Sequence, residues 1–245
     1  MTIAEKTPSL DGQINKSPLW WQRPWIIPLA VVVLAFLAYQ VNRFWGVWGT
    51  SEAPVSPHGG FTLYFPLLGI HMLGGFTAMF AAMLQVWPRL RRNHPVVHRF
   101  SGRIYVVATL IAGTGALLIV RFAPPAGRIG VIVATIIWMT TAVAGFVLAR
   151  RGNYVAHRAV MLYSFAALMS IVMGVVIVEL GLALPVTVNT VYLNYLLESG
   201  RWGGLLVDLM IVQWWLLRTA NKPIAFGPTP DYRRRHDIPA PTTHP

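Results

Sequence analysis

One short basic pattern occurs twice in this chain, and each copy stands between two long apolar runs. The pattern is Arg-Arg, five further residues, then His-Arg, and it occupies Arg91 to Arg99 and again Arg150 to Arg158, 59 positions later. Because the apolar runs on either side are long enough to cross a bilayer, the two copies are predicted to be equivalent charged turns on one face of a membrane.

The composition indicates that the folded chain is largely surrounded by lipid. Apolar residues make up 55% of the 245 residues, charged residues only 11%, and the mean hydropathy is +0.55, whereas soluble domains carry about 25% charged residues. A membrane-spanning helix needs roughly 20 apolar residues. Unsatisfied backbone groups are costly in lipid and the apolar runs show no strict alternation, so helices are predicted rather than barrel strands. Six spans of an all-α, polytopic membrane helix bundle are expected, at about residues 26–45, 61–87, 104–122, 130–148, 159–180 and 203–217.

Lysine and arginine are divided unevenly between the two sides of this predicted bundle. If the six spans alternate in direction, sixteen of the 20 cations lie on the side of the repeated turns, and only four, Arg43, Arg121, Arg128 and Arg201, lie on the other side. The positive-inside rule then predicts cytoplasmic termini and a multi-pass protein of the bacterial cytoplasmic (inner) membrane. The net charge of +12 needs no nucleic acid, because anionic lipid headgroups are the nearest partners of cations in short turns beside lipid.

The domain organisation is simple. Residues 24–220 form the transmembrane helical domain, while residues 1–23 and the basic, Pro-rich residues 221–245 are expected to be mobile cytoplasmic tails. The first 23 residues are mixed polar and the first apolar run is too long for a signal peptide, so no cleavage is expected. The chain has no cysteine, which excludes disulfides, thiolate metal sites, iron–sulfur clusters and covalently attached haem.

The two copies of the repeat also predict where two helices begin. Aligning them pairs His94-Pro95 with Asn153-Tyr154. Each pair offers a capping residue followed by a first helical residue, and proline suits the latter position well.

The two histidines of the repeat are candidate ligands of a haem iron. His98 and His157 fall in the first turn of helices that run in the same direction, so their imidazoles are predicted at nearly the same depth. A positive helix end and a neighbouring arginine favour the neutral imidazole, which is the form that binds a metal. Gly102, one turn beyond His98, would let a flat ligand approach. Three arginines are placed to meet haem propionates: Arg99, Arg103 and Arg158.

The same basic turns also fit a plainer role. Paired basic turns at a membrane face commonly bind lipid phosphates and fix the orientation of the protein. His98 precedes the apolar run at residue 104 by six positions, or roughly 9 Å of helix, which places it near the headgroups. The sequence therefore leaves both haem ligation and lipid anchoring open.

A polar stripe lies on the second apolar segment. Its members recur at three- and four-residue spacing: His71, Gly74, Gly75, Ala78, Ala82 and Gln85. Small residues allow close helix approach and polar ones are costly against lipid, so this face is expected to point into the bundle. Asp208, a carboxylate well inside the sixth span, is predicted to meet His71 in the outer half of the bilayer. His71, Gln85 and Asp208 are candidates for a proton or quinone site, with a purely structural hydrogen bond as the alternative.

These residues carry a family resemblance. Four stretches of the chain resemble an uncharacterised bacterial membrane-protein family, domain of unknown function 2306, over about residues 60–180. They are the run from His71, the run from Gln85, the string His98-Arg-Phe-Ser-Gly-Arg-Ile-Tyr105 and the second basic turn. The resemblance implies a multi-pass inner-membrane protein with no established activity. It marks as candidate site residues His71, Gln85, His98, Arg99, Gly102, His157 and Arg158. A looser, fold-level similarity is to cytochrome b561-like proteins, which hold haem between histidine pairs; this chain lacks a second matched pair.

Two functions of different classes are compatible with these features. The first is a membrane oxidoreductase with one b-type haem held by His98 and His157, exchanging electrons with a quinone or redox partner near His71. The second is a non-catalytic membrane subunit or small-solute permease whose histidines are structural, and a parallel repeat is compatible with a permease.

Overall fold

The computed structural model describes residues 26–44 and 61–219, and within these ranges it contains helices and no strand. The predicted all-α class is therefore confirmed. The predicted tails, residues 1–23 and 221–245, lie outside the described residues.

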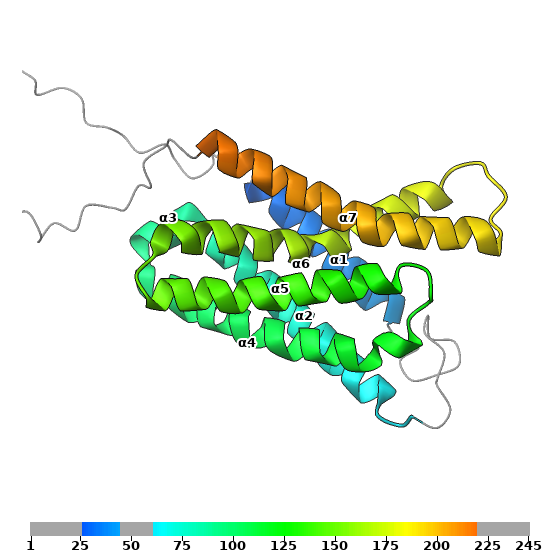
Figure 1. Ribbon diagram of the computed structural model, residues 1–245, viewed down its shortest axis with the longest axis horizontal. Helices are drawn as coiled ribbons and strands as arrows, with labels where there is room; N and C mark the ends of the chain where they lie inside the picture. The colour runs from blue at the N-terminus through cyan, green and yellow to red at the C-terminus, as the bar shows by residue number, and fades with distance from the viewer. Residues whose placement is uncertain (1–25, 45–60, 220–245) are drawn as a thin grey trace, which may run out of the picture.

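The long helices lie side by side in an elongated bundle and run in alternating directions (Figure 1). In chain order they are α1 (Ile26–Phe44), α2 (Tyr64–Val86), the short α3 (Pro88–Asn93), α4 (Pro95–Ile119) with a 3-10 turn η2 (Val120–Phe122), α5 (Arg128–Arg150), α6 (Tyr154–Leu182) and α7 (Thr190–Thr219). The two basic turns lie at the same end of this bundle, where α1 begins and α7 ends. We call it the repeat end, and the other the opposite end.

Five of the described helices are long and apolar enough to cross a membrane: α1, α2, α4 with η2, α5 and α6. The helices extend beyond the apolar spans expected from residues 104 and 159, because α4 begins at Pro95 and α6 at Tyr154, where the aligned repeat predicts the first helical residues. Hydropathy falls at the charged residues of each turn, but the helical backbone continues through them. The side chain of Asn153 caps α6 by accepting a hydrogen bond from the Ala156 amide at 3.1 Å, as the aligned repeat predicts. The matching residue His94 precedes α4 but makes no side-chain capping bond, so that half of the prediction is wrong.

The last predicted span differs most from the structure. Residues 190–219 form one continuous helix, α7, which begins well before the expected span of residues 203–217. Its 30 residues correspond to roughly 45 Å. α7 is not among the five strongly apolar helices, and it contains Glu198, Arg201 and Asp208. It packs against α6, so it extends through the same depth of the bundle.

The helices pair as the repeat predicts. α2 packs against α4 and α5 packs against α6, while α4 and α5 join the two hairpins. The buried core lies between them and includes Ala112, Trp138 and Leu168.

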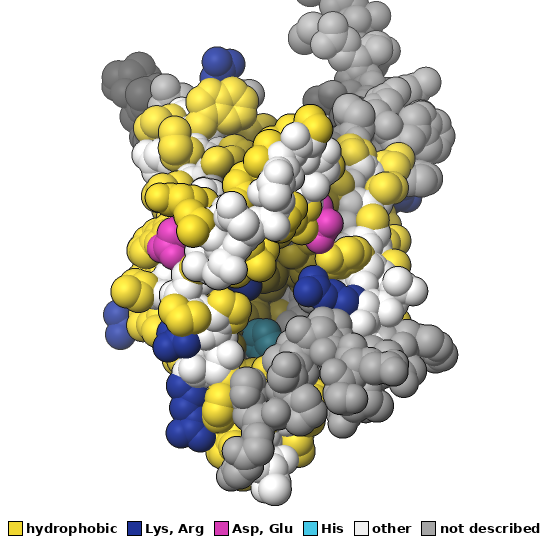
Figure 2. Space-filling model, turned by 90° about the vertical axis from the view of Figure 1, so that its right-hand side faces the viewer, with side chains coloured by type: hydrophobic (Ala, Val, Ile, Leu, Met, Phe, Trp, Pro, Cys, Tyr) yellow, Lys and Arg dark blue, Asp and Glu magenta, His cyan; other side chains and the backbone are white. Residues whose placement is uncertain are grey.

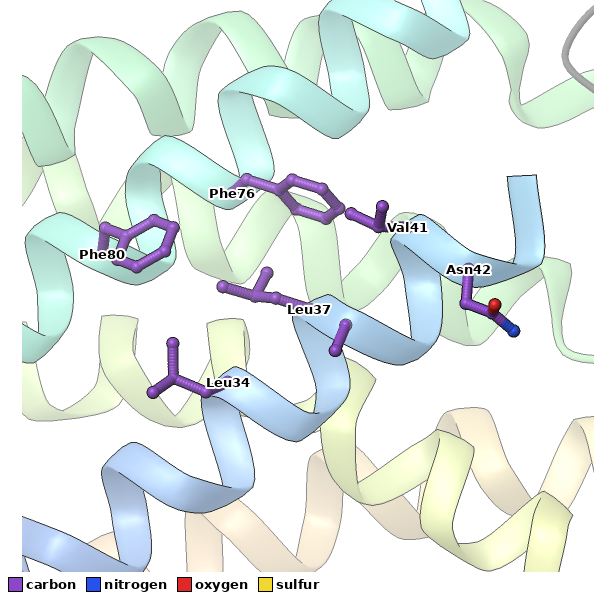
Figure 3. A pocket seen from close by; sticks show the side chains of 7 residues that line it. Leu34, Leu37, Val41, Asn42, Phe76 and Phe80 are labelled. Carbon is purple, nitrogen blue, oxygen red and sulfur yellow. The ribbon is translucent and has the colours of Figure 1, made fainter. Parts of the chain in front are cut away.

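α1 occupies the edge of the bundle. An outward-facing groove of about 610 Å³ separates it from α2, with Leu34, Leu37 and Val41 on one wall and Phe76 and Phe80 on the other (Figure 3). The candidate site residues belong to α2, α4, α6 and α7.

Candidate functional site

His157 lies in the first turn of α6 and is held by the neighbouring helix. Its Nδ1 is 2.8 Å from the carbonyl oxygen of Gly145 on α5. A carbonyl can only accept, so Nδ1 carries the hydrogen and donates it, and in the neutral ring Nε2 keeps a lone pair. Histidines that bind metals are commonly oriented in this way by a backbone carbonyl. The fold thus orients His157 as a base or a ligand.

His98 occupies the matching position in the first turn of α4. Its Nδ1 is buried and makes no hydrogen bond. His98 lies near the start of α4 and His157 near the start of α6, so the two imidazoles of the repeat lie at the same end of the bundle. A buried ring nitrogen without a partner is uncommon, and such groups call for an explanation.

Gln85 links the end of α2 to the start of α4, close to His98. Its Nε2 donates to the His98 carbonyl oxygen and to Ser101 Oγ, each at 2.6 Å. The same amide fills the space beside Gly102, where an added Cβ would lie 3.4 Å from Gln85 Oε1. The gap expected to admit a flat ligand therefore holds a side chain of the protein.

The three arginines expected to meet propionates have different environments. Arg99 and Arg103 are exposed, whereas Arg158 is half-buried. Arg158 donates to Thr219 Oγ1 at 3.1 Å and so ties α6 to the last residue of α7. Thr219 was not identified from the sequence, because nothing in the local pattern relates it to the repeat.

Deeper in the bundle, a buried polar cluster joins three helices. The hydroxyl of Tyr105 lies 2.7 Å from Ser164 Oγ and accepts a hydrogen bond from Trp138 Nε1 at 3.0 Å. Tyr105 and Ser164 are 59 positions apart, which is the spacing of the basic turns. Neither Trp138 nor Ser164 was identified from the sequence, although adding the repeat spacing to Tyr105 would have indicated Ser164.

His71 lies toward the opposite end, well separated from the other two histidines. Its Nδ1 is 2.9 Å from the carbonyl oxygen of Ala112 on α4, so this nitrogen also donates and Nε2 keeps a lone pair. Figure 2 shows a histidine side chain in a hollow of the opposite end. Ala112 lies 14 residues beyond His98, or roughly 21 Å along α4.

The predicted contact between His71 and Asp208 is wrong. His71 bonds to α4 instead, and Oδ2 of Asp208 is buried without a hydrogen-bond partner. Asp208 also lies deeper than expected. Gly204, one turn before it, touches Ser170 on α6, which places Asp208 near the middle of α6. It remains a buried carboxyl group in the membrane region, and such residues are functional candidates by default.

The donor set limits the kinds of cofactor that this site could hold. Among the described residues, no group of three or more His, Cys, Asp or Glu side chains gathers to bind a metal ion. The candidate ligands of a haem iron at the repeat end are the imidazoles of His98 and His157. Nδ1 of His98 is buried without a partner, and the ring of His157 is oriented by a carbonyl oxygen.

Comparison with known proteins identifies the family. No curated protein and no solved structure matches this chain, and the looser similarity to cytochrome b561-like proteins is not shown. One family model, described as "Predicted membrane protein (DUF2306)", matches residues 68–216. The matched segment starts before His71 and ends after Asp208, so it contains every candidate site residue, and it covers more than half of the chain. The chain therefore belongs to the family of multi-pass membrane proteins called domain of unknown function 2306.

Proposed function

We propose that this protein binds a b-type haem at the repeat end and carries electrons in the bacterial cytoplasmic membrane. One observation supports this proposal more than any other: His157, oriented by Gly145, lies at the same end of the bundle as His98, whose buried Nδ1 has no partner. Two imidazoles in the first turns of parallel helices would be suited to hold a haem iron.

The remaining residues of the repeat end have supporting roles in this proposal. His98 and His157 would hold the iron, and Arg99, Arg103 and Arg158 would face the propionates. A bound haem supplies one-electron redox chemistry. The bonds from Gln85 to His98 and Ser101 fix the first turn of α4, and with it the position of the His98 ring.

The position of His71 restricts where an electron partner could act. Because roughly 21 Å of helix separates its level from that of His98, a quinone or redox protein beside His71 could not touch either ligand. We therefore place the partner at the repeat end. Gln85 belongs to that end as well, whereas His71 and Asp208 do not.

The proposal is tested by a visible spectrum of the detergent-purified protein, before and after dithionite. We expect a Soret band that shifts on reduction in the wild type and that is lost in His98→Gln and in His157→Gln. His94→Gln is the matched control, since His94 is exposed in the adjacent turn, and it should keep the band. A wild type that shows no Soret band, even when expressed with ample haem, would overturn the proposal.

A second candidate function is favoured by the way the histidines join helices. His71 ties α2 to α4 and His157 ties α5 to α6, each through a backbone carbonyl. In a non-catalytic membrane subunit or a small-solute permease, these bonds would only hold the bundle together. The histidine variants would then lower thermal stability by the equivalent of about 1 kcal/mol each, and no variant or wild type would absorb visible light.

A further inference from the structure

We propose that the bend between α2 and α4 is a binding site for the headgroup of an anionic phospholipid. The site, which we call the α3 elbow, is a cleft of about 290 Å³ lined by Trp87, Arg89, Leu90 and His94. It lies at the repeat end, where α2 finishes and α4 starts. Its residues are not those that the proposed function uses, so the two proposals stand independently.

The lining of the α3 elbow combines apolar and basic side chains, which match the apolar and phosphate parts of a phospholipid. Trp87 and Leu90 are half-buried and form an apolar wall, while Arg89 and His94 are exposed. A guanidinium group offers paired donors that match two phosphate oxygens. Tryptophan is favoured at headgroup level because its ring is apolar and its N–H is polar. One wall can therefore contact the first carbons of an acyl chain while the arginine meets the phosphate.

Among the described residues, the charged side chains at the repeat end are all basic. Nine arginines of the described residues lie at the repeat end: Arg89, Arg91, Arg92, Arg99, Arg103, Arg150, Arg151, Arg158 and Arg218. The three described carboxylates, Glu179, Glu198 and Asp208, lie elsewhere, on the later part of α6 and on α7. No described acidic side chain can therefore neutralise this end, and the phosphates of the adjacent leaflet are the nearest negative charges.

The second copy of the repeat provides an internal comparison. There the chain passes from α5 to α6 through three residues, with Gly152 in the left-handed region at φ 74°. A Cβ on Gly152 would meet no atom within 4 Å, so no other part of the described chain packs against this position. The first copy has a six-residue helix at this position, which builds the cleft. The two turns thus share their charge but not their shape.

This difference allows a sharp experiment on the full-length protein in detergent. We would measure the apparent affinity for phosphatidylglycerol by native mass spectrometry, with phosphatidylcholine as the neutral lipid. Arg89→Gln should weaken phosphatidylglycerol binding by about fivefold or more. The matched control, Arg150→Gln, removes one exposed arginine beside the turn between α5 and α6, which has no short helix like α3, and should change the affinity by less than about twofold. Trp87→Leu leaves the charge unchanged and should also weaken binding.

Each alternative outcome has a distinct meaning. Equal losses in Arg89→Gln and Arg150→Gln, with no loss in Trp87→Leu, would show diffuse attraction to a charged surface and would overturn the proposal. Full competition by millimolar inorganic phosphate would show a phosphate site rather than a lipid site, and would also overturn it. Thermal unfolding of each variant shows whether the bundle is intact. If Trp87→Leu does not fold, the comparison between the two arginine variants decides.

Discussion

The hydroxyl of Tyr105 lies in the middle of the bundle, on a side chain that is only 1% exposed. It is 2.7 Å from Ser164 Oγ and 3.0 Å from Trp138 Nε1, which donates to it. Water and lipid offer no partner at this depth, so the three polar groups must satisfy one another. The cluster is also where residues related by the repeat spacing meet, which makes it the link between the two hairpins.

Removing the Tyr105 hydroxyl group should destabilise the protein. Tyr105→Phe leaves the Trp138 Nε1 hydrogen without its acceptor, so the free energy of unfolding should fall by about 1–3 kcal/mol. The control Tyr195→Phe changes a side chain that is 69% exposed and should stay within about 0.5 kcal/mol of the wild type. Thermal or denaturant unfolding in detergent measures both. A Tyr105 variant as stable as the control would mean that the cluster contributes nothing to stability.

The element with the closest packing is α7. A Cβ on Gly174 of α6 would lie 2.7 Å from the carbonyl oxygen of Gly200, and one on Gly204 would lie 2.8 Å from the Gly174 amide nitrogen. The two backbones therefore touch. In lipid, helices associate through close packing rather than through burial from water, so small residues at the contact are decisive. This contact holds α7 against α6 even though α7 contains charged residues.

A pair of glycine substitutions tests whether the backbones of α6 and α7 touch. Gly174→Ala forces the two helices apart and should lower stability by about 1–3 kcal/mol. Gly75→Ala places the same methyl group where no atom lies within 4 Å, so it should be neutral or raise stability by up to about 1 kcal/mol through helix propensity. Both can be followed by thermal unfolding. Equal effects of the two substitutions would show that α6 and α7 are not in backbone contact.

The whole molecule is polarised along its length. The arginine-rich repeat end carries both basic turns, whereas the opposite end carries the hollow seen in Figure 2. Positive charge favours the cytoplasmic side of a membrane, so we predict that the repeat end faces the cytoplasm.

The absence of cysteine from the sequence makes this prediction simple to test. Single cysteines at Arg92 and Arg151, which are exposed at the repeat end, should be protected in intact cells from a membrane-impermeant maleimide. A cysteine at Pro124, exposed at the opposite end, should be labelled. Disrupted cells provide the control in which all three react. Labelling of Arg92→Cys but not Arg151→Cys in intact cells would place the two turns on different sides.

The sequence by itself determined the class, the paired hairpins and the shared position of the two basic turns. These features depend on local hydropathy and charge, which act on each segment independently of its neighbours. The start of α4 at Pro95 and of α6 after Asn153 could also be predicted, because caps are local.

Only the tertiary structure decided which side chains meet. The rotation of each helix about its axis and its register against the next are set by packing, and a local pattern does not fix them. For that reason His71 bonds to Ala112 and not to Asp208, Gln85 fills the space beside Gly102, and one of two similar basic turns has the cleft of the α3 elbow.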